Sequence, residues 1–338
     1  MTTPPSSPGF AGPGHTASLV VDPAEFAAND PFIVLADDRL ELAHGAHVGG
    51  EHPHAGFEIA TFVVEGALID RDEGVLRAGD LLWTRAGRGI IHNEEVTTEG
   101  RTRILQLWRA LPESERWSEP WFETTTRDRA PVRREPIVIP SAVAPVIPSA
   151  VAPVIPSAVE GSAPVIPSPS TSLRAGSVDG SLAGRPGAEV VVYAGSSGGV
   201  DAPSGRHAPM TLLDVRLERG ALSIDVDLPA SQAGFVYVLE GAARVGDENA
   251  ELRAGQIGWL DRSSEEGVSS LRLTSSPTEG TRLVLYAAPP IGESLVFHGP
   301  FVGGTREDLM RVSRDYMDGS FVRMSEIARR RLSTASTL

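Results

Sequence analysis

Two closely spaced pairs of residues in the N-terminal part of the chain could bind a metal ion. His52 and His54 lie within GEHPHAGFE, and His92 and Glu94 lie further along within GRGIIHNEE. One residue separates the members of each pair, so on a β-strand both side chains would point to the same face. Three imidazole nitrogens and one carboxylate oxygen suit iron, manganese, nickel, cobalt or copper and leave positions open for a substrate. The sequence therefore predicts a transition-metal site at these four residues.

Glu58 is an alternative carboxylate for this site. It shares the even-numbered spacing of His52 and His54, so it could replace Glu94 as a ligand or orient a histidine by accepting a hydrogen bond. A bulge near residues 55–56 would turn Glu58 to the other face, and geometry alone favours Glu94. The chain has no cysteine, which excludes thiolate ligands and disulfides and disfavours a closed structural zinc site.

The chain contains an internal repeat. FVVEGALIDRDEGVLRAGDLLW is matched by YVLEGAARVGDENAELRAGQIGW, and LQLWRALP (105–112) is matched by LVLYAAPP (283–290). Such an ordered repeat indicates two copies of one fold. The repeated segments are short, apolar and separated by Gly, Asp and Glu, which is typical of strands. Only TREDLMRVSRDYMDG (305–319) has a helical pattern, and it begins with a capping box. We predict an all-β chain of two antiparallel barrels or sandwiches with a C-terminal helix.

The second copy lacks the histidines of the first. When the copies are aligned on their shared EGA and RAG motifs, His52 corresponds to Asp227 and His92 corresponds to Val268. The alignment therefore predicts one metal in the N-terminal barrel. The second barrel is expected to be a structural or docking partner of the first.

A proline-rich segment separates the two copies. From Val138 an eight-residue unit beginning VIPSAV is repeated, and proline cannot join a helix or a central strand. We predict an N-terminal metal-binding barrel at 10–135, a disordered linker at 136–188, a C-terminal barrel without metal ligands at 189–300, and a C-terminal helix and tail at 301–338. A docking strip for a partner is the alternative role of the linker.

The composition argues against several classes of partner. The net charge of −14 argues against direct binding of nucleic acid or of an anionic membrane, because both require a basic surface. The N-terminal residues show neither the basic nor the apolar region of a secretory signal. Prolines interrupt the most apolar run, so a membrane-spanning helix is not expected. A cytoplasmic protein is predicted.

Several motifs together resemble the pirin family of the cupin superfamily: HPHAGFE, GDLLWTRAGRGIIHNEE, LQLW and GPFVGGTREDL. The resemblance covers both barrels and the C-terminal helix. It implies two tandem cupin-type barrels (a double-stranded β-helix, or jelly roll) with one divalent metal in the first barrel. Fe(II) is expected first, with Mn, Ni, Co or Cu as alternatives. The implied ligands are His52, His54, His92 and Glu94, which leaves Glu58 as a non-ligand.

The sequence departs from the family in two respects, and neither removes a ligand. The linker is longer than pirins usually have, and Asn93 and Glu95 stand where relatives often carry Ala and Met. Glu95 adds a negative charge near the entrance of the expected site.

The resemblance implies two functions of different class, and the fold does not decide between them. One is a quercetin 2,3-dioxygenase-type enzyme that cleaves a small flavonol-like aromatic with O₂, with Glu94 as general base. The other is a non-enzymatic, iron redox-sensing regulator whose metal state controls binding to a protein partner that the sequence does not identify. We expect the dioxygenase.

Overall fold

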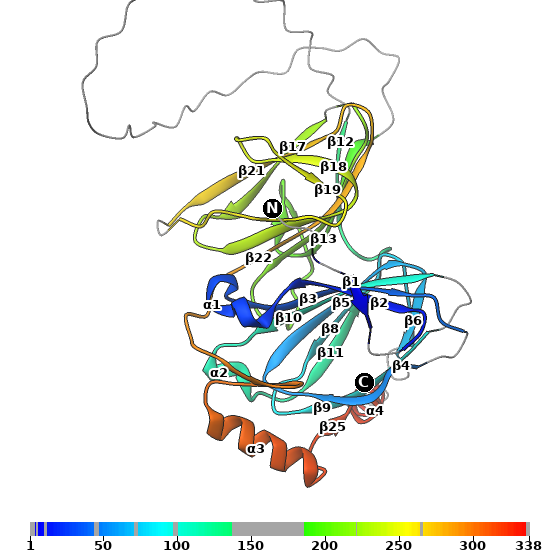
Figure 1. The fold of residues 1–338 in the computed structure, drawn as a ribbon, viewed down its shortest axis with the longest axis vertical. Coiled ribbons are helices and arrows are strands. Elements are labelled where there is room, and N and C mark those ends of the chain that lie inside the picture. The colour runs from blue at the N-terminus through cyan, green and yellow to red at the C-terminus, as the bar shows by residue number, and fades with distance from the viewer. Residues whose placement is uncertain are drawn as a thin grey trace, which may run out of the picture.

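Two strand-rich barrels lie one above the other, and the C-terminal helices lie against the lower, N-terminal barrel (Figure 1). The computed structural model describes residues 4, 6–9, 12–43, 47–70, 74–96, 101–136, 186–220, 222–263 and 266–335. The predicted linker falls almost entirely outside the described residues, and the domain boundaries remain predictions. The prediction of an all-β chain with two antiparallel barrels and a C-terminal helix is confirmed.

The first barrel is built from two sheets. Its strands are β1 (Ser6–Pro8), β2 (His15–Val21), β3 (Phe32–Leu40), β4 (His47–His54), β5 (Phe57–Glu65), β6 (Ala67–Asp70), β7 (Gly74–Arg77), β8 (Leu81–Arg85), β9 (Ile90–Val96), β10 (Thr102–Ala110) and β11 (Trp121–Thr125). One sheet has the order β1-β2-β3-β10-β5-β8-β11, and the other joins β4, β9, β6 and β7. Short helical turns η1 (Pro23–Glu25), α1 (Phe26–Asn29) and α2 (Glu113–Arg116) connect them.

The second barrel repeats this plan. Its strands are β12 (Val132–Pro136), β13 (Pro186–Ala194), β14 (Ser196–Ser197), β15 (Val200–Asp201), β16 (Thr211–Leu217), β17 (Ser223–Pro229), β18 (Ala233–Val245), β19 (Ala250–Arg253), β20 (Ile257–Trp259), β21 (Val268–Ser275) and β22 (Thr281–Ala288). The main sheet has the order β12-β13-β16-β22-β18-β21-β17. β18 lies next to β22 as β5 lies next to β10, so β18 is the counterpart of β5.

β5 is buried on both faces because it lies between the interior of its barrel and the second barrel. Eight of its nine residues are buried. Phe57 and Ile59 join an apolar cluster inside the first barrel, whereas Ala60, Phe62 and Val64 join the core between the barrels. This alternation follows from the period of two in a strand. It also decides which side chains of β5 can reach the candidate site.

The barrels pack face to face through one continuous apolar core. Aromatic side chains of the two barrels meet there: Phe32 lies 5.0 Å from Phe235, and Phe62 lies 5.3 Å from Tyr193, between ring centroids. Both contacts are edge-to-face, an arrangement that aromatic rings favour. Burial of these rings on both sides indicates that the two barrels form one packed unit.

A buried aspartate and arginine pair occurs once in each barrel at this interface. Asp37 and Asp214 are fully buried. Arg103 donates to both carboxylate oxygens of Asp37 at 2.8 Å, and Arg282 donates to both oxygens of Asp214 at 3.0 and 3.1 Å. Such two-point pairs fix the geometry as well as neutralise the buried charge.

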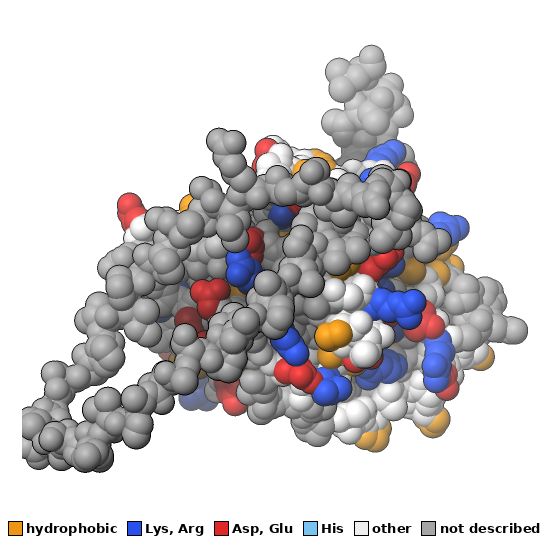
Figure 2. Space-filling model, turned by 90° about the horizontal axis from the view of Figure 1, so that it is seen from above, with side chains coloured by type: hydrophobic (Ala, Val, Ile, Leu, Met, Phe, Trp, Pro, Cys, Tyr) orange, Lys and Arg blue, Asp and Glu red, His pale blue; other side chains and the backbone are white. Residues whose placement is uncertain are grey.

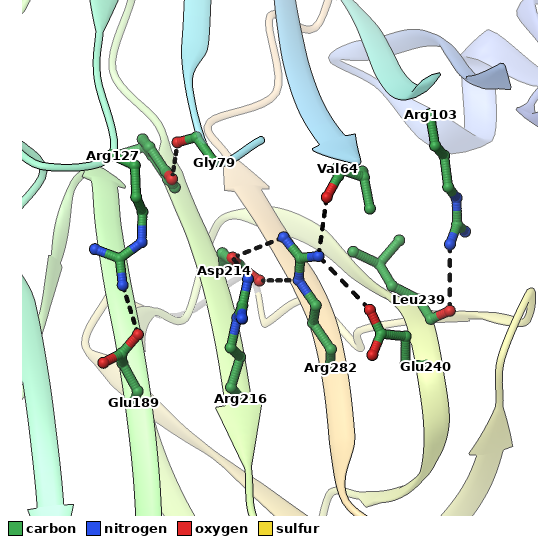
Figure 3. A network of polar contacts seen from close by, with 11 residues as sticks. Val64, Gly79, Arg103, Arg127, Glu189, Asp214, Arg216, Leu239, Glu240 and Arg282 are labelled. Atoms are coloured by element: carbon green, nitrogen blue, oxygen red, sulfur yellow. Dashed lines mark hydrogen bonds and ion pairs between the residues drawn. The ribbon is translucent and has the colours of Figure 1, made fainter. Parts of the chain in front are cut away.

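Each arginine also reaches the backbone of the other barrel (Figure 3). Arg103 of the first barrel donates to the carbonyl of Leu239 at 3.4 Å, and Arg282 of the second donates to the carbonyl of Val64 at 3.2 Å. The exchange is reciprocal, so the two copies are related by an approximate two-fold axis. We refer to the two pairs and these crossing bonds as the arginine lock.

Strand pairing gives the true alignment of the two copies. Arg103 lies opposite Glu65 in the first barrel, and Arg282 lies opposite Glu240 in the second. Arg103 therefore corresponds to Arg282. The match of LQLWRALP with LVLYAAPP pairs Arg103 with Thr281, and it is wrong by one residue.

The chain returns to the first barrel after completing the second. β23 (Val296–His298), β24 (Phe301–Gly303), α3 (Arg306–Met317), β25 (Val322–Arg323) and α4 (Met324–Ala335) follow β22. β25 pairs in parallel with β9, and Met324 and Ile327 of α4 enter the core of the first barrel beside Leu68. The predicted helix is present: Thr305 accepts from the backbone of Asp308 in a capping box. This tail closes the lower end of the first barrel.

The charges on the surface and the lengths of the helices can be compared with the expectation that the chain binds neither nucleic acid nor a membrane. On the face in Figure 2, arginine and acidic side chains are interspersed, and the described part of that face carries no extended basic patch. Within the described residues, every helix is too short or too polar to cross a membrane. The cytoplasmic location stays a prediction.

Candidate metal centre

Three imidazoles converge on one point inside the first barrel. His52 on β4 lies directly opposite His92 on the neighbouring strand β9, and His54 lies two residues further along β4. One ligand nitrogen from each of the three lies within 4.8 Å of the others. His54 and His92 are buried, and His52 is half-buried. The structure thus brings together three of the four predicted site residues.

The spacing of His52 and His92 fits ligands of a single ion. Their Nε2 atoms are 2.9 Å apart. Two nitrogens that are each about 2.1 Å from a metal, at an angle of about 90°, lie about 3 Å from each other. The observed distance therefore requires little movement of either ring on metal binding.

The backbone around Gly50 orients His52. The Nδ1 atom of His52 lies 2.8 Å from the carbonyl oxygen of Gly50. Because a carbonyl only accepts hydrogen bonds, Nδ1 carries the proton and Nε2 keeps its lone pair for a metal. Gly50 has a φ of +63°, and the pairing of β4 with β9 shifts between Val48 and Glu51. This bulge, which favours glycine, places the carbonyl where it can fix the ring.

His54 is the histidine that most clearly needs a further partner. It is 3% exposed, and neither of its ring nitrogens has a hydrogen-bond partner among the described residues. A buried polar group without a partner is costly. Coordination of an ion shared with His52 and His92 would satisfy one of the two nitrogens.

Burial keeps the imidazoles of His52 and His54 neutral at physiological pH. Burial, and then the proximity of His92, lowers the pKa of His52 to about 4, although its hydrogen bond to Gly50 opposes the shift. Burial also lowers the pKa of His54 well below its usual value, and His92 and His52 lower it further. The neutral imidazole is the form that binds metal ions. The donor set therefore fits a divalent transition metal.

An aromatic wall stands beside His54. The rings of Phe57 and Trp108 stack with centroids 4.4 Å apart, and the His54 ring meets them edge-on at 5.5 and 5.1 Å. The indole Nε1 of Trp108 donates to Gln106 at 3.0 Å, which fixes the ring. Trp108 is half-buried and offers a flat apolar face next to the imidazoles, and the fully buried Phe57 supports its ring from behind.

The C-terminal tail holds the turn that follows His54. The backbone N–H of Ala55 donates to the carbonyl of Pro300 at 3.3 Å, and that of Val302 donates to the carbonyl of Ala55 at 3.0 Å. Gly56 has a φ of +93°, and a Cβ there would lie 1.9 Å from the carbonyl oxygen of Val302. Only glycine fits this turn. No local sequence pattern predicts this support, because it joins segments more than two hundred positions apart.

Of the two candidate carboxylate ligands, Glu94 and Glu58, only Glu58 has a side chain that the structure describes. Glu94 lies on β9, but its side chain falls outside the described residues, so its role as a ligand stays a prediction. Glu58 faces the second barrel: it accepts from Arg85 at 2.8 Å and from the backbone of Ala208 at 3.1 Å. The turn at Gly56 puts Glu58 on the face opposite the imidazoles. Glu58 is therefore removed as an alternative ligand and helps to join the barrels.

Strand pairing identifies the counterparts of the histidines in the second barrel. Asp70 and Val245 both lie four residues after the glycine of the EGA motif, and they lie opposite Glu94 and Leu273, respectively, so Leu271 is the counterpart of His92. Val226 on β17 lies opposite Leu271 on β21, as His52 lies opposite His92. His52 and His92 therefore correspond to Val226 and Leu271, and His54 corresponds to Leu228, two residues after Val226.

The alignment with Asp227 and Val268 is wrong. Asp227 points outward, whereas Val226 is buried. The turn from β17 to β18 is one residue longer than that from β4 to β5, and the connection from β20 to β21 is also longer than its counterpart. Counting from shared glycines cannot detect such insertions. The prediction that the second copy lacks metal-binding histidines in these strands is unaffected.

Comparisons with known proteins agree on one family. A family model described as Pirin matches residues 17–109, and one described as Pirin C-terminal cupin domain matches residues 212–322. Pirin-like protein 2 of Arabidopsis thaliana is 28% identical over 315 residues, which cover 91% of this chain and 80% of that protein.

Two further matches carry the name of an enzyme. A Pseudomonas aeruginosa protein named "Putative quercetin 2,3-dioxygenase" is 28% identical over 283 residues, covering 81% of this chain and 79% of that protein. The crystal structure of quercetin 2,3-dioxygenase from Acinetobacter baumannii superposes with a TM-score of 0.69 at 22% identity, covering 94% of each chain. At that identity the superposition shows a shared fold.

Proposed function

Because this chain belongs to the pirin family of cupin proteins, we propose that its first barrel holds one catalytic metal ion and acts as a quercetin 2,3-dioxygenase-type enzyme. The proposed ligands are His52, His54, His92 and Glu94. The observation that carries the proposal is the cluster of three converging imidazoles beside an aromatic wall. The name of the Pseudomonas relative supports the choice of a flavonol-like substrate.

A divalent metal, with iron(II) expected first, would supply Lewis acidity and open coordination positions for an aromatic substrate and O₂. The residues of the chain would do the rest. Trp108, held in place by the buried ring of Phe57, would position the flat rings of a flavonol next to the imidazoles. Glu94 would accept the proton of the flavonol 3-hydroxyl as general base. The tail at residues 300–302 would keep His54 in place through the turn at Gly56.

The test combines metal analysis with oxygen uptake. The protein is loaded separately with iron, manganese, nickel, cobalt and copper, and O₂ consumption is followed with quercetin. We expect turnover with at least one metal and its loss in His92→Ala. Glu94→Gln should lower turnover by about 10²-fold or more. His298→Ala, at an exposed position outside the site, is the matched control and should be fully active.

Absence of turnover with all five metals would refute the enzymatic proposal. If the protein then still retained one metal ion, the metal-dependent regulator would become the better account. That account predicts that the set of proteins captured by the metal-loaded chain changes when the metal is removed with a chelator.

A further inference from the structure

The second barrel contains a cavity at the position of the metal site in the first. Its volume is about 480 Å³, within the range of small-molecule sites. Leu228 and Leu271, the counterparts of His54 and His92, line it. The cavity is therefore the interior of the twin barrel with aliphatic side chains in place of the imidazoles.

The cavity exists partly because the aromatic wall is missing. Trp108 lies opposite Ile59 in the first barrel, and Ala287 lies opposite Gly234 in the second. Ala287, which lines the cavity, is thus the counterpart of Trp108. Ala233 lies opposite Ala288 as Glu58 lies opposite Arg109, so Gln232, one residue before Ala233, takes the place of Phe57. The two large rings that fill the first barrel beside its histidines are replaced by a methyl group and an amide.

A glycine opens the cavity further. Leu82 lies opposite Thr61, and Gly258 lies opposite Val236, so Gly258 is the counterpart of Leu82. Leu82 is buried in the core of the first barrel, together with Met324 of the tail. Gly258 lines the cavity instead. The second barrel thereby lacks a leucine that closes the corresponding space in the first.

The lining selects for an uncharged aromatic molecule. Its inner residues, including Leu228 and Leu252, belong to the apolar core of the second barrel. Trp259, 41% exposed, stands at the mouth and offers an aromatic contact. The described lining residues include no basic side chain, whereas Glu248 and Asp261 are exposed there. An anion would meet two carboxylates and no compensating charge, so anions are disfavoured.

One polar group points to the character of the ligand. The amide oxygen Oε1 of Gln232 is shielded from solvent and makes no hydrogen bond with any described residue. Unlike the exposed polar residues Glu248, Asp261, Ser269 and Ser270 of the lining, this acceptor is shielded from water, and such a group is best satisfied by a donor on a bound molecule. A hydroxyl or amine on the ligand would supply that donor.

We propose that the second barrel binds a small, uncharged aromatic molecule that donates a hydrogen bond to Gln232. The site uses no metal ligand and shares no residue with the metal centre. It gives the second barrel a binding role of its own, in addition to its packing against the first. The proposal stands whether or not the first barrel is a dioxygenase.

Isothermal titration calorimetry of the full chain with three naphthalene probes tests the proposal. 2-Naphthol has the donor, 2-methoxynaphthalene has nearly the same shape without it, and 2-naphthoate is an anion. We expect saturable one-site binding of 2-naphthol, with about 5–10-fold weaker binding of the methoxy compound, as one lost hydrogen bond implies. 2-Naphthoate should bind more weakly still. Equal affinity for all three probes, or no saturable binding of 2-naphthol, would overturn the proposal.

Two variants locate the binding. Gly258→Leu installs the side chain that the first barrel has at this position and should weaken 2-naphthol binding at least tenfold. A Cβ at Gly258 would meet the flexible end of Leu252 at 2.7 Å, and that end can move aside. Gln232→Leu should abolish the preference for 2-naphthol over 2-methoxynaphthalene while apolar binding persists. The second variant keeps the test decisive if the first does not fold.

His54→Ala is the matched control, because it disables the metal centre and leaves the cavity intact. Binding of 2-naphthol should be unchanged in this variant and after treatment with a chelator. Loss of binding in His54→Ala, together with normal binding in Gly258→Leu and Gln232→Leu, would place the probe in the first barrel and refute the proposal.

Discussion

In the first barrel, three imidazoles, two of them buried and one half-buried, meet within 4.8 Å. In the second, the same strand positions carry Val226, Leu228 and Leu271, and the space beside them is a cavity of about 480 Å³. The backbone plan and the pairing of the strands are shared. A few inward-pointing side chains therefore decide whether a barrel of this fold offers a metal centre or an apolar site.

The two barrels also differ in what closes them. Met324 and Ile327 of the tail enter the core of the first barrel, and β25 extends the sheet that carries His92. Among the described residues, no comparable segment enters the second barrel. The tail thus supports the barrel in which side-chain geometry must be held most closely.

The arginine lock is the feature that the barrels share, and it should have the largest effect on stability. Asp37→Ala leaves Arg103, whose side chain is only 12% exposed, without its carboxylate, which should cost about 3–5 kcal/mol in the free energy of unfolding. Asp214→Ala should cost somewhat less, because Asp37 also accepts from Tyr237 at 2.7 Å. Denaturant unfolding measures both, with the exposed Asp227→Ala as control. Equal stability of all three variants would contradict the lock.

Substitution to alanine at one equivalent core position, Leu82 in the first barrel and Gly258 in the second, should change the free energy of unfolding by different amounts. Leu82 is 1% exposed, so Leu82→Ala should lower the free energy of unfolding by about 2–5 kcal/mol. Gly258→Ala, at the equivalent position, adds a methyl group at the edge of a cavity and should change it by less than about 1 kcal/mol. Thermal and denaturant unfolding of the pair provide the measurement. A large loss in Gly258→Ala would show that the side chain of Leu252, 2.7 Å from the added methyl group, cannot move aside.

The interface tyrosines predict a loss of stability in alkali. Burial raises the pKa of Tyr193, Tyr237 and Tyr286 above the usual value, and Asp214 or Asp37 adds to the shift. In the unfolded chain tyrosine ionises near pH 10. Stability should therefore be unaffected below about pH 10 and fall above it by about 1.4 kcal/mol per pH unit for each tyrosine.

Denaturant unfolding between pH 8 and 11.5 tests this pH dependence. Tyr286→Phe should reduce the alkaline slope by one proton, whereas Tyr316→Phe, at an exposed position, should leave it unchanged. An identical slope in both variants would show that the interface tyrosines are not the cause.

At neutral pH, Tyr237→Phe and Tyr286→Phe should change the free energy of unfolding by different amounts, and these are the smallest effects that we expect. Tyr237→Phe removes a hydrogen bond to the buried Asp37 and should cost about 1–2 kcal/mol. The hydroxyl of Tyr286 has no hydrogen-bond partner among the described residues. Tyr286→Phe should therefore be neutral or slightly stabilising. The midpoint of thermal unfolding at pH 7.5 distinguishes them, and a destabilised Tyr286→Phe would indicate a partner such as a bound water.

Much of the fold and part of the site could be predicted from local sequence patterns. Alternating residues identify side chains on one face of a strand, so the spacing of His52 and His54 predicts that both point to the same side. The structure places His92 opposite His52 on the neighbouring strand, as a pair of adjacent strands requires. The repeat of the EGA and RAG motifs predicted two barrels, and the capping box at Thr305 predicted the helix. These signals depend on residues close together in the sequence.

Features that depend on chain geometry or on distant segments could not be predicted. Glu58 has the spacing of a ligand, but the turn at Gly56 reverses its face. One extra residue before β18 turns Asp227 outward and moves Val226 into the barrel. The support of His54 by residues 300–302 joins the two ends of the chain. None of these leaves a local pattern.

Measurement of the metal content of the chain tests most directly whether the first barrel holds a metal ion. Purified protein is reloaded with each of the five metals and analysed by mass spectrometry alongside His54→Ala and its twin-barrel counterpart Leu228→Ala, both checked for folding by circular dichroism. We predict one ion per chain in the wild type and in Leu228→Ala, and an affinity lower by more than about 100-fold in His54→Ala. Unchanged metal content in His54→Ala, or its loss in Leu228→Ala, would contradict a metal centre in the first barrel.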